Sequence, residues 1–387
     1  MTINFSRRNV LNSIGCLAVS TSGLVGCGPT TGKSAATAAT THRSIATRNV
    51  IDHVTDGLLA QIRRQSIPPP QATRAFAMGH LAGFLALNGV VQRYRTPHSI
   101  GNGPAGADPQ TAYATAFSRA AGIAVGANMG PHASSGLAHI ANSDRKSLGV
   151  TWGERVGTYV AGIRRQDGSG RTAHVLDSQR YPKRRGPMTW VPTGNHHGAR
   201  GTVATLANAP PLLPGWGKLR PFGISSARAF RPEAFPAANS PEFARQFQKV
   251  KHLGRFQNSQ RSADQTQIAM FWEDGPGGVS PPGHWQVIAM RVLQPLGLDL
   301  ITYAHHLALF SMSQADAAIV AWDSKYHYDV VRPVTAIRTY GNHIQNNRNL
   351  NQADPTWRSL IPSPPFPAYI SGHSAFAGAS ARMLANV

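Results

Sequence analysis

The sequence is poor in acidic residues, and this shortage sets its electrostatic character. Its 387 residues include 38 Lys and Arg but only 17 Asp and Glu, so the formal net charge is +21. Such a charge attracts polyanions. The basic residues are nevertheless scattered, with no long run beyond Lys183-Arg184-Arg185, and no nucleic-acid-binding motif accompanies them. The charge therefore indicates a surface that attracts anions and argues against specific nucleic-acid binding.

Cysteine is almost absent, and the two cysteines, Cys16 and Cys27, both lie close to the N-terminus. An internal disulfide framework is therefore excluded. Arg7 and Arg8 precede a mildly apolar run without any acidic residue, which is typical of a twin-arginine (Tat) export signal. We predict a signal peptide over residues 1–26 and export of a folded protein.

The end of the apolar run, Leu24-Val25-Gly26-Cys27, resembles a bacterial lipobox, in which Cys27 would be lipidated. The alternative is an ordinary cleaved signal with an incidental cysteine. Residues 27–47 are rich in Ser, Thr and Ala and predict a flexible tether. No later apolar run reaches the roughly 20 residues of a membrane span. We therefore expect a periplasmic or cell-surface protein that is attached to the membrane only through its lipid.

The remaining chain, residues 48–387, shows helical periodicity far more often than the alternation of a strand. Helix starts are indicated by capping residues ahead of apolar segments, namely Thr151-Trp152-Gly153-Glu154, Ser240-Pro241, Ser262 with Gln265, and Asp299. Residues 167–238 are instead rich in Gly and Pro, and Trp190, Trp216 and Phe222 would pin them against the helices. The sequence predicts an all-α helical bundle with a long wrapping loop.

Two basic residues, Lys325 and Arg332, stand seven residues apart just before Pro333. On a continuous helix this spacing is nearly two turns, so both side chains would project from one face. Two adjacent cations repel each other unless an anion lies between them, and the planar guanidinium suits a tetrahedral oxyanion. The pair therefore predicts an oxyanion site, and the alternative is a basic pair on a solvated helix face.

A second segment, Ser371-Gly372-His373, follows a proline-rich stretch and precedes a helical pattern. It therefore falls at a helix N-terminus, where free N–H groups and the helix dipole favour an anion. Gly372 allows close backbone approach, Ser371 offers a hydroxyl, and His373 titrates near neutral pH and can move protons. Alone, the segment is better explained as a helix cap beside a stray histidine. After the basic pair, it predicts the second half of an oxyanion cradle.

Together, Lys325-x6-Arg332-Pro333 and Ser371-Gly372-His373 resemble the first two signature motifs of the vanadium-dependent haloperoxidase and type 2 phosphatidic acid phosphatase (PAP2) superfamily. Further stretches resemble its bacterial haloperoxidase-like branch and extend the resemblance over about residues 48–387. They include Arg74-Ala75-Phe76-Ala77-Met78, Val250-Lys251-His252-Leu253-Gly254, Phe271-Trp272-Glu273-Asp274-Gly275, Pro282-Gly283-His284-Trp285, Asp354-Pro355-Thr356-Trp357 and Pro364-Pro365-Phe366-Pro367. The sequence departs from the family at Ile370, where Pro is usual, and at Leu85, where Asp is usual.

The resemblance implies the family's helical bundle and a bound vanadate, with no haem. In a haloperoxidase, Lys325, Arg332, Ser371 and the Gly372 N–H would hold the oxyanion, and His373 would assist proton movement while hydrogen peroxide oxidises a halide. Trp322 and Phe366 match family positions near the halide, although both are also ordinary core aromatics. Because vanadate copies the geometry of phosphoryl transfer, the same cradle would serve an acid phosphatase acting on a phosphate ester.

The family's third motif, which contains an Arg for the oxyanion and the His that binds vanadium, has no counterpart within residues 1–387. The resemblance therefore implies a C-terminally truncated relative with no direct metal ligand and impaired or absent activity. A third hypothesis is a non-catalytic exported protein that binds oxyanions. His305 and His306 are the first residues to test as substitute ligands, although their spacing does not support this role. The halide, the organic substrate and the oligomeric state are not indicated.

Overall fold

The computed structural model describes residues 49–170, 181, 186, 188–193, 210–340 and 353–387. The predicted signal peptide, Cys27 and the tether lie outside these ranges. Within them the regular structure is helical, with two isolated antiparallel bridges, Thr189 with Val330 and Arg255 with Ser359. The prediction of an all-α fold is confirmed for the described residues.

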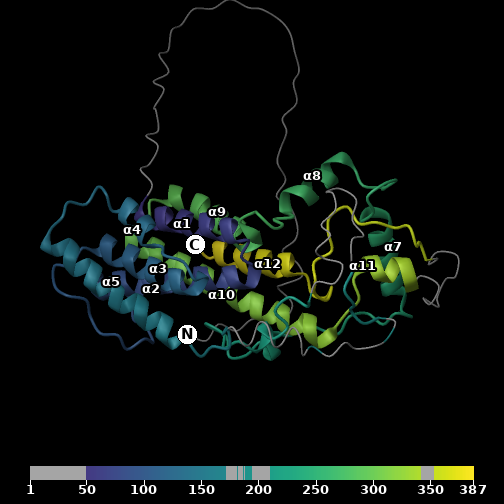
Figure 1. The fold of residues 1–387 in the computed structure, drawn as a ribbon, viewed down its shortest axis with the longest axis horizontal. Helices are drawn as coiled ribbons and strands as arrows, with labels where there is room; N and C mark the ends of the chain where they lie inside the picture. Colours follow the sequence, from purple (N-terminus) through teal and green to yellow (C-terminus); the bar gives the residue numbers. More distant parts are fainter. Residues whose placement is uncertain (1–48, 171–180, 182–185, 187, 194–209, 341–352) are drawn as a thin grey trace, which may run out of the picture. The chain divides into compact units, whose positions relative to one another are not determined.

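The elements are named as in Figure 1. The α-helices are α1 (Val50–Gln65), α2 (Pro69–Val91), α3 (Pro109–Val125), α4 (Gly130–Gly136), α5 (Asp144–Ile163), α7 (Pro241–Leu253), α8 (Ala263–Trp272), α9 (Ser280–Leu293), α10 (Leu300–Tyr328), α11 (Pro333–Thr335) and α12 (Gly372–Leu384). Shorter helical turns are η2 (Trp216–Lys218), η3 (Arg228–Phe230), η4 (Gln294–Leu296) and η5 (Ala336–Tyr340).

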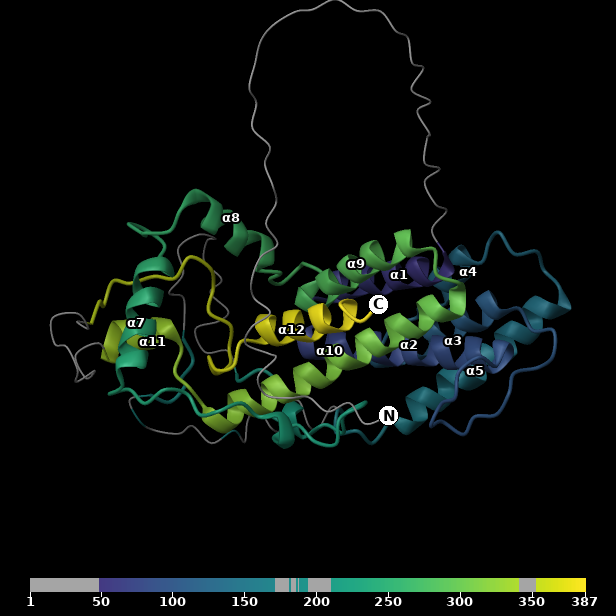
Figure 2. The same ribbon diagram turned by 180° about the vertical axis from the view of Figure 1, so that it is seen from behind.

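Helix α2 is the centre of the bundle and packs against α3, α5 and α10 (Figures 1 and 2). It is apolar around most of its circumference, which is the pattern of a helix surrounded by others. Gly83 allows the close approach of α3, because a Cβ there would lie 2.6 Å from the ring of Tyr113. On the other side, α10 packs against α12, and α12 packs against α9. The longest helix, α10, therefore runs from the bundle core toward the predicted site.

Helix α2 is also long and apolar enough to cross a membrane, contrary to the expectation that no such run follows the tether. However, 83% of its apolar 18-residue window is buried inside the protein. This burial is explained by the position of α2 at the centre of the bundle, where neighbouring helices cover its apolar surface.

Three of the helix starts predicted from capping residues are confirmed. Ser240, Ser262 and Asp299 each accept a hydrogen bond from the backbone N–H three residues later, at the starts of α7, α8 and α10. Ser262 and Gln265 form a complete capping box, in which each side chain bonds the backbone of the other residue. These caps satisfy N–H groups that would otherwise lack partners at a helix start.

The helix start predicted at Thr151 is wrong. Helix α5 already begins at Asp144 with Ser143 as its cap, so Thr151 lies inside the helix. Its hydroxyl bonds back to the carbonyl of Ser147. Because Ser and Thr can bond either a helix start or the preceding turn, the residue type alone does not determine which of them begins the helix.

The described parts of the 167–238 loop are pinned as predicted. Trp216 is buried, and its turn η2 packs against α10. Further along, the carboxylate of Asp316 on α10 accepts hydrogen bonds from the backbone N–H groups of Phe222, Gly223 and Ile224, at 2.6, 2.7 and 3.0 Å. The loop is therefore fastened to the side of the helix that leads to the predicted site.

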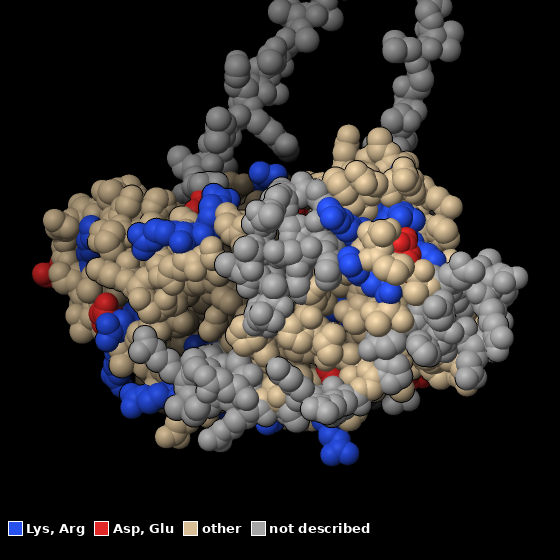
Figure 3. All heavy atoms as spheres, turned by 45° about the vertical axis from the view of Figure 1, so that its right-hand side comes forward, with Lys and Arg blue, Asp and Glu red and all other residues tan. Residues whose placement is uncertain are grey.

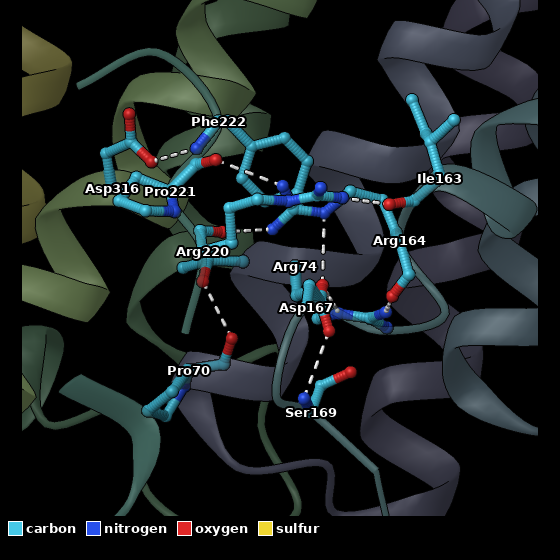
Figure 4. A network of polar contacts seen from close by, with 11 residues as sticks. Pro70, Arg74, Ile163, Arg164, Asp167, Ser169, Arg220, Pro221, Phe222 and Asp316 are labelled. Atoms are coloured by element: carbon cyan, nitrogen blue, oxygen red, sulfur yellow. Dashed lines mark hydrogen bonds and ion pairs between the residues drawn. The ribbon is translucent and has the colours of Figure 1, made fainter. Parts of the chain in front are cut away.

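A buried ion pair network fastens the start of the same loop (Figure 4). The carboxylate of Asp167 accepts hydrogen bonds from Arg74 on α2 at 2.8 Å and from Arg164 at the end of α5 at 3.0 Å. The Arg164 guanidinium also donates to the carbonyls of Arg220 and Pro221 and stacks on the Phe222 ring at 3.8 Å. One carboxylate thus joins two helices to the returning loop.

Candidate functional site: an oxyanion cradle

Lys325 lies in the last turn of α10 and is only 1% exposed. Its Nζ donates hydrogen bonds to the carbonyl oxygens of Pro367 and Ala368, at 3.0 and 3.3 Å. The same Nζ is 4.7 Å from the centre of the Phe366 ring, within the range of a cation–π contact. Burial, and then the neighbouring charge of Arg332, lower the pKa of Lys325 well below its ordinary value.

Arg332 reaches the same place, but not along the helix face that was predicted. Helix α10 ends at Tyr328, and Asp329 follows in the left-handed conformation with φ of 53°. Asp tolerates this conformation better than most residues, and its carboxylate here accepts a hydrogen bond from Tyr181. Arg332 then continues in extended backbone and precedes α11. The turn at Asp329, rather than helical spacing, directs Arg332 to the site.

The aromatic side chains Trp322 and Phe366 lie beside the two cations. Their ring centres are 5.2 Å apart, and the Arg332 guanidinium is 5.3 Å from the Phe366 ring. The indole N–H of Trp322 donates to the carbonyl of Leu212, which fixes this ring against the wrapping loop. The two aromatics singled out in the sequence are therefore grouped with both cations.

Ser371 caps α12, and Gly372 is the first residue of that helix, as predicted. The Ser371 hydroxyl oxygen accepts the N–H of Ser374 at 3.2 Å, and its own hydrogen remains able to donate. A Cβ on Gly372 would lie 3.4 Å from the Trp322 ring, so the start of α12 packs against the aromatic side of the cradle. The anion-favouring end of a helix is thus close to the cation-bearing end of α10.

His373 is exposed in the first turn of α12. Its Nε2 is 3.1 Å from the carbonyl oxygen of Glu273, the residue that follows α8. In the neutral ring this contact makes Nε2 the donor and leaves Nδ1 as an acceptor. Within the described residues no hydrogen bond joins His373 to Lys325 or Arg332, so its predicted role in proton movement stays a prediction.

The electrostatics of the cradle suit an anion. Arg332 is partly exposed, but its Nε is buried and has no hydrogen-bond partner. Burial lowers the pKa of Arg332 to about 10. Among the described residues no carboxylate forms an ion pair with Lys325 or Arg332. Two neighbouring cations and an unpaired guanidinium nitrogen are the donor set that a tetrahedral oxyanion requires.

The remaining histidine candidates do not belong to this site. His305 lies 20 residues before Lys325 on the same helix, which corresponds to about 30 Å at 1.5 Å per residue. Its ring instead stacks on Tyr94 with centres 4.3 Å apart, and His306 is its neighbour. Neither residue can therefore act as the substitute ligand suggested for them.

Sequence reasoning missed two parts of the site. The Glu273 carbonyl that meets His373 belongs to a stretch noted only for its family resemblance, and backbone acceptors have no signature in sequence. The carbonyls of Pro367 and Ala368 that bind Lys325 were missed for the same reason. The proline-rich composition of residues 364–367 was the available signal, because proline keeps a carbonyl acceptor while it prevents helix formation.

Comparison with known proteins gives a consistent result. Residues 305–387 match the family described as the VCPO second helical-bundle domain. Vanadium chloroperoxidase from Curvularia inaequalis is 29% identical over 148 residues, which cover 33% of this chain and 23% of that protein. The chain thus matches less than a quarter of the length of this relative.

Solved structures extend the similarity over most of the fold. A bacterial vanadium-dependent iodoperoxidase superposes with a TM-score of 0.68 and 22% identity, covering 87% of this chain and 80% of that one. A bacterial vanadium-dependent chloroperoxidase in its apo form gives a TM-score of 0.61 with 17% identity, covering 83% and 79%. At these identities the structures show a shared fold.

Proposed function

We propose that the cradle binds vanadate, and the similarity of the chain to vanadium-dependent haloperoxidases supports this proposal. The observation that carries the proposal is the pair of cations, Lys325 and Arg332, which lie together with no carboxylate partner among the described residues. Bound vanadate would supply the chemistry by which hydrogen peroxide oxidises a halide. The family match includes both cations and Ser371-Gly372-His373.

Each residue of the cradle has a distinct task in this proposal. Lys325 provides a point charge that its two carbonyl partners hold in place. Arg332 provides a planar fork with its Nε free to donate. The Gly372 N–H and the Ser371 hydroxyl donate from the start of α12, and the His373 imidazole moves a proton to or from the oxyanion. Trp322 and Phe366 exclude water from the side where a halide would approach.

Replacement of Arg332 by alanine is expected to weaken vanadate binding about tenfold or more. A hydrogen bond to a charged group contributes about 1.5–3 kcal/mol, and the substitution removes at least one of them. Isothermal titration calorimetry with vanadate measures the change in Kd. Arg228→Ala, an exposed arginine in η3, is the matched control and should bind like the wild type. Equal Kd values for wild type and Arg332→Ala would show that Arg332 does not contribute to vanadate binding.

The catalytic part of the proposal is tested by bromination of a phenol with bromide, hydrogen peroxide and vanadate. Because residues 1–387 include no third-motif Arg or His, we expect weak activity from the 387-residue chain. Appending the corresponding segment of a vanadium chloroperoxidase should increase the rate and the melting temperature. In that extended chain His373→Ala should lower the rate by about a hundredfold, as loss of a general acid–base group does.

Two results would contradict the catalytic part of the proposal. Hydrolysis of an aryl phosphate that vanadate inhibits, without bromination, would instead assign the cradle to an acid phosphatase. Vanadate binding without either activity, in both the original and the extended chain, would indicate a non-catalytic oxyanion-binding protein.

A further inference from the structure

A cavity separate from the oxyanion cradle is lined by helices α2, α3 and α5 and by the chain that follows α5. Its volume is about 370 Å³, which falls within the range of pockets that hold small organic ligands. It is lined by Arg74, Arg119 and Arg165 and, on its apolar side, by Met78 and Ile123. It shares no lining residue with the oxyanion cradle.

The polar side of this cavity is strongly basic. Arg74 is held by Asp167, but Asp167 is shared with Arg164, so one carboxylate faces two guanidinium groups. Arg119 meets Glu154 only at 3.4 Å, in a pair that is about half exposed on both sides, and such pairs contribute little. Arg165 is exposed, and its side chain makes no hydrogen bond or ion pair among the described residues. The local charge is therefore not balanced within the described chain.

Of the three arginines that line the cavity, Arg165 is the one whose side chain has no stabilising contact with the described residues. The carbonyls at the end of α5 already have guanidinium partners, because Arg220 donates to Ile163 and Arg74 donates to Arg164 (Figure 4). Those two arginines stabilise the fold through these contacts, whereas the Arg165 side chain makes none with the described residues. Its guanidinium lies at the edge of the cavity, where a ligand could bind it.

The cavity also has an apolar side, so it combines basic and apolar surfaces. Met78 is buried on α2, and Ile123 on α3 is 49% exposed. The apolar surface that Ile123 still exposes to water is buried only when a ligand covers it, and this burial favours binding. An inorganic anion would use the arginines but would leave Met78 and Ile123 without a contact.

We propose that this cavity binds a small organic carboxylate with an apolar body. A carboxylate matches the planar guanidinium fork in a bidentate geometry, and the apolar body would cover Ile123 and reach Met78. The ligand class follows from these two sides together. The proposal is independent of vanadate binding, because the two sites have no residue in common.

Calorimetric titration of the full chain with 2-naphthoate tests the proposal. The wild type should bind, Arg165→Ala should weaken binding about tenfold, and Ile123→Asp should weaken it further by adding charge to the apolar side. Neutral 2-naphthalenemethanol should bind at least tenfold more weakly than 2-naphthoate. Raising the salt concentration should weaken binding of the carboxylate because part of the attraction is electrostatic.

Two controls separate this site from others. Arg155→Ala removes an arginine of α5, the helix just before Arg165, and the Arg155 guanidinium lies over Trp152 at 5.5 Å. This variant should leave the Kd for 2-naphthoate unchanged. Arg332→Ala should also leave it unchanged. Absence of binding, equal binding of the alcohol, an unchanged Kd in Arg165→Ala, displacement by equimolar inorganic phosphate, or loss of binding in Arg332→Ala would each overturn the proposal.

Discussion

Lys325→Met is expected to make the anion-free protein more stable, by about 1–3 kcal/mol, while it abolishes the response to oxyanions. A buried ammonium group beside another cation is costly because desolvation is not offset by an opposite charge. Methionine keeps the length of the stem and removes the charge. The gain is limited because the carbonyls of Pro367 and Ala368 lose their hydrogen-bond donor.

The pH dependence of this effect has a definite sign. Burial lowers the folded-state pKa of Lys325 below its ordinary value, so the unfolded chain binds more protons between the lowered pKa and about 10.4. The free energy of unfolding of the wild type should therefore rise with pH through this window. The advantage of Lys325→Met should shrink over the same range, because the cost of deprotonating the buried lysine on folding falls as the pH rises toward the unfolded pKa.

Urea denaturation with and without vanadate or phosphate measures both effects. An oxyanion that binds only the folded wild type raises its stability with concentration, whereas the variant should show no increase. Arg228→Ala again serves as the control and should respond like the wild type. A variant that is less stable than the wild type without anion, yet still stabilised by vanadate, would show that Lys325 is an ordinary structural residue.

Asp167→Ala is expected to destabilise the protein by about 3–5 kcal/mol at neutral pH. The Asp167 side chain is 0% exposed, and its loss would leave Arg164, which is 5% exposed, without a counter-charge. Removing one partner of a buried ion pair costs about this much because the other charge remains buried. The loop at residues 220–222 would also lose support, since Arg164 donates to its carbonyls.

Acid should reveal the same interaction in the wild type. Burial tends to raise the pKa of Asp167, but the charge and hydrogen bond of Arg74, together with Ser169 and Arg164, outweigh it, and the net pKa lies below the ordinary value. Its contribution is complete above the unfolded value of about 3.9 and is lost as the pH falls toward the lower folded pKa. Denaturation with guanidinium chloride measures the free energy of unfolding at pH 7 and pH 3. The difference between the two pH values should therefore be smaller for Asp167→Ala than for the wild type.

The control for this experiment is Glu154→Ala. Glu154 and Arg119 form an exposed pair at 3.4 Å, so its loss should change stability by less than about 1 kcal/mol. A loss in Asp167→Ala no greater than in Glu154→Ala would contradict the assigned importance of the buried network.

Much of the fold could be predicted because helix caps act locally. Ser240, Ser262 and Asp299 bond a backbone N–H only three residues away, so their effect is visible in a short stretch of sequence. The site was predicted in its composition but not in its geometry. The turn at Asp329 depends in part on Tyr181, which lies 148 residues earlier, and no local pattern contains that contact.

The cavity lined by α2, α3 and α5 could not be predicted for a related reason. Arg74 and Arg165 are ordinary basic residues in sequence, and Lys and Arg residues are dispersed over the face seen in Figure 3. Only the packing of α2, α3 and α5 brings these two to one cavity. Helical spacing places Arg74 and Met78 on one side of α2, but it does not show which neighbour leaves an opening there.

The division of the cradle between one helix and several irregular segments affects how such a protein can evolve. Lys325 is fixed by α10, which is also part of the bundle core, so changes to its position would disturb the whole fold. Phe366 and the contacts of Leu212 instead belong to segments outside the helices, where substitutions and insertions are better tolerated. Under the proposed function, selection can therefore alter which molecules approach the cradle while the charges of Lys325 and Arg332 stay in place.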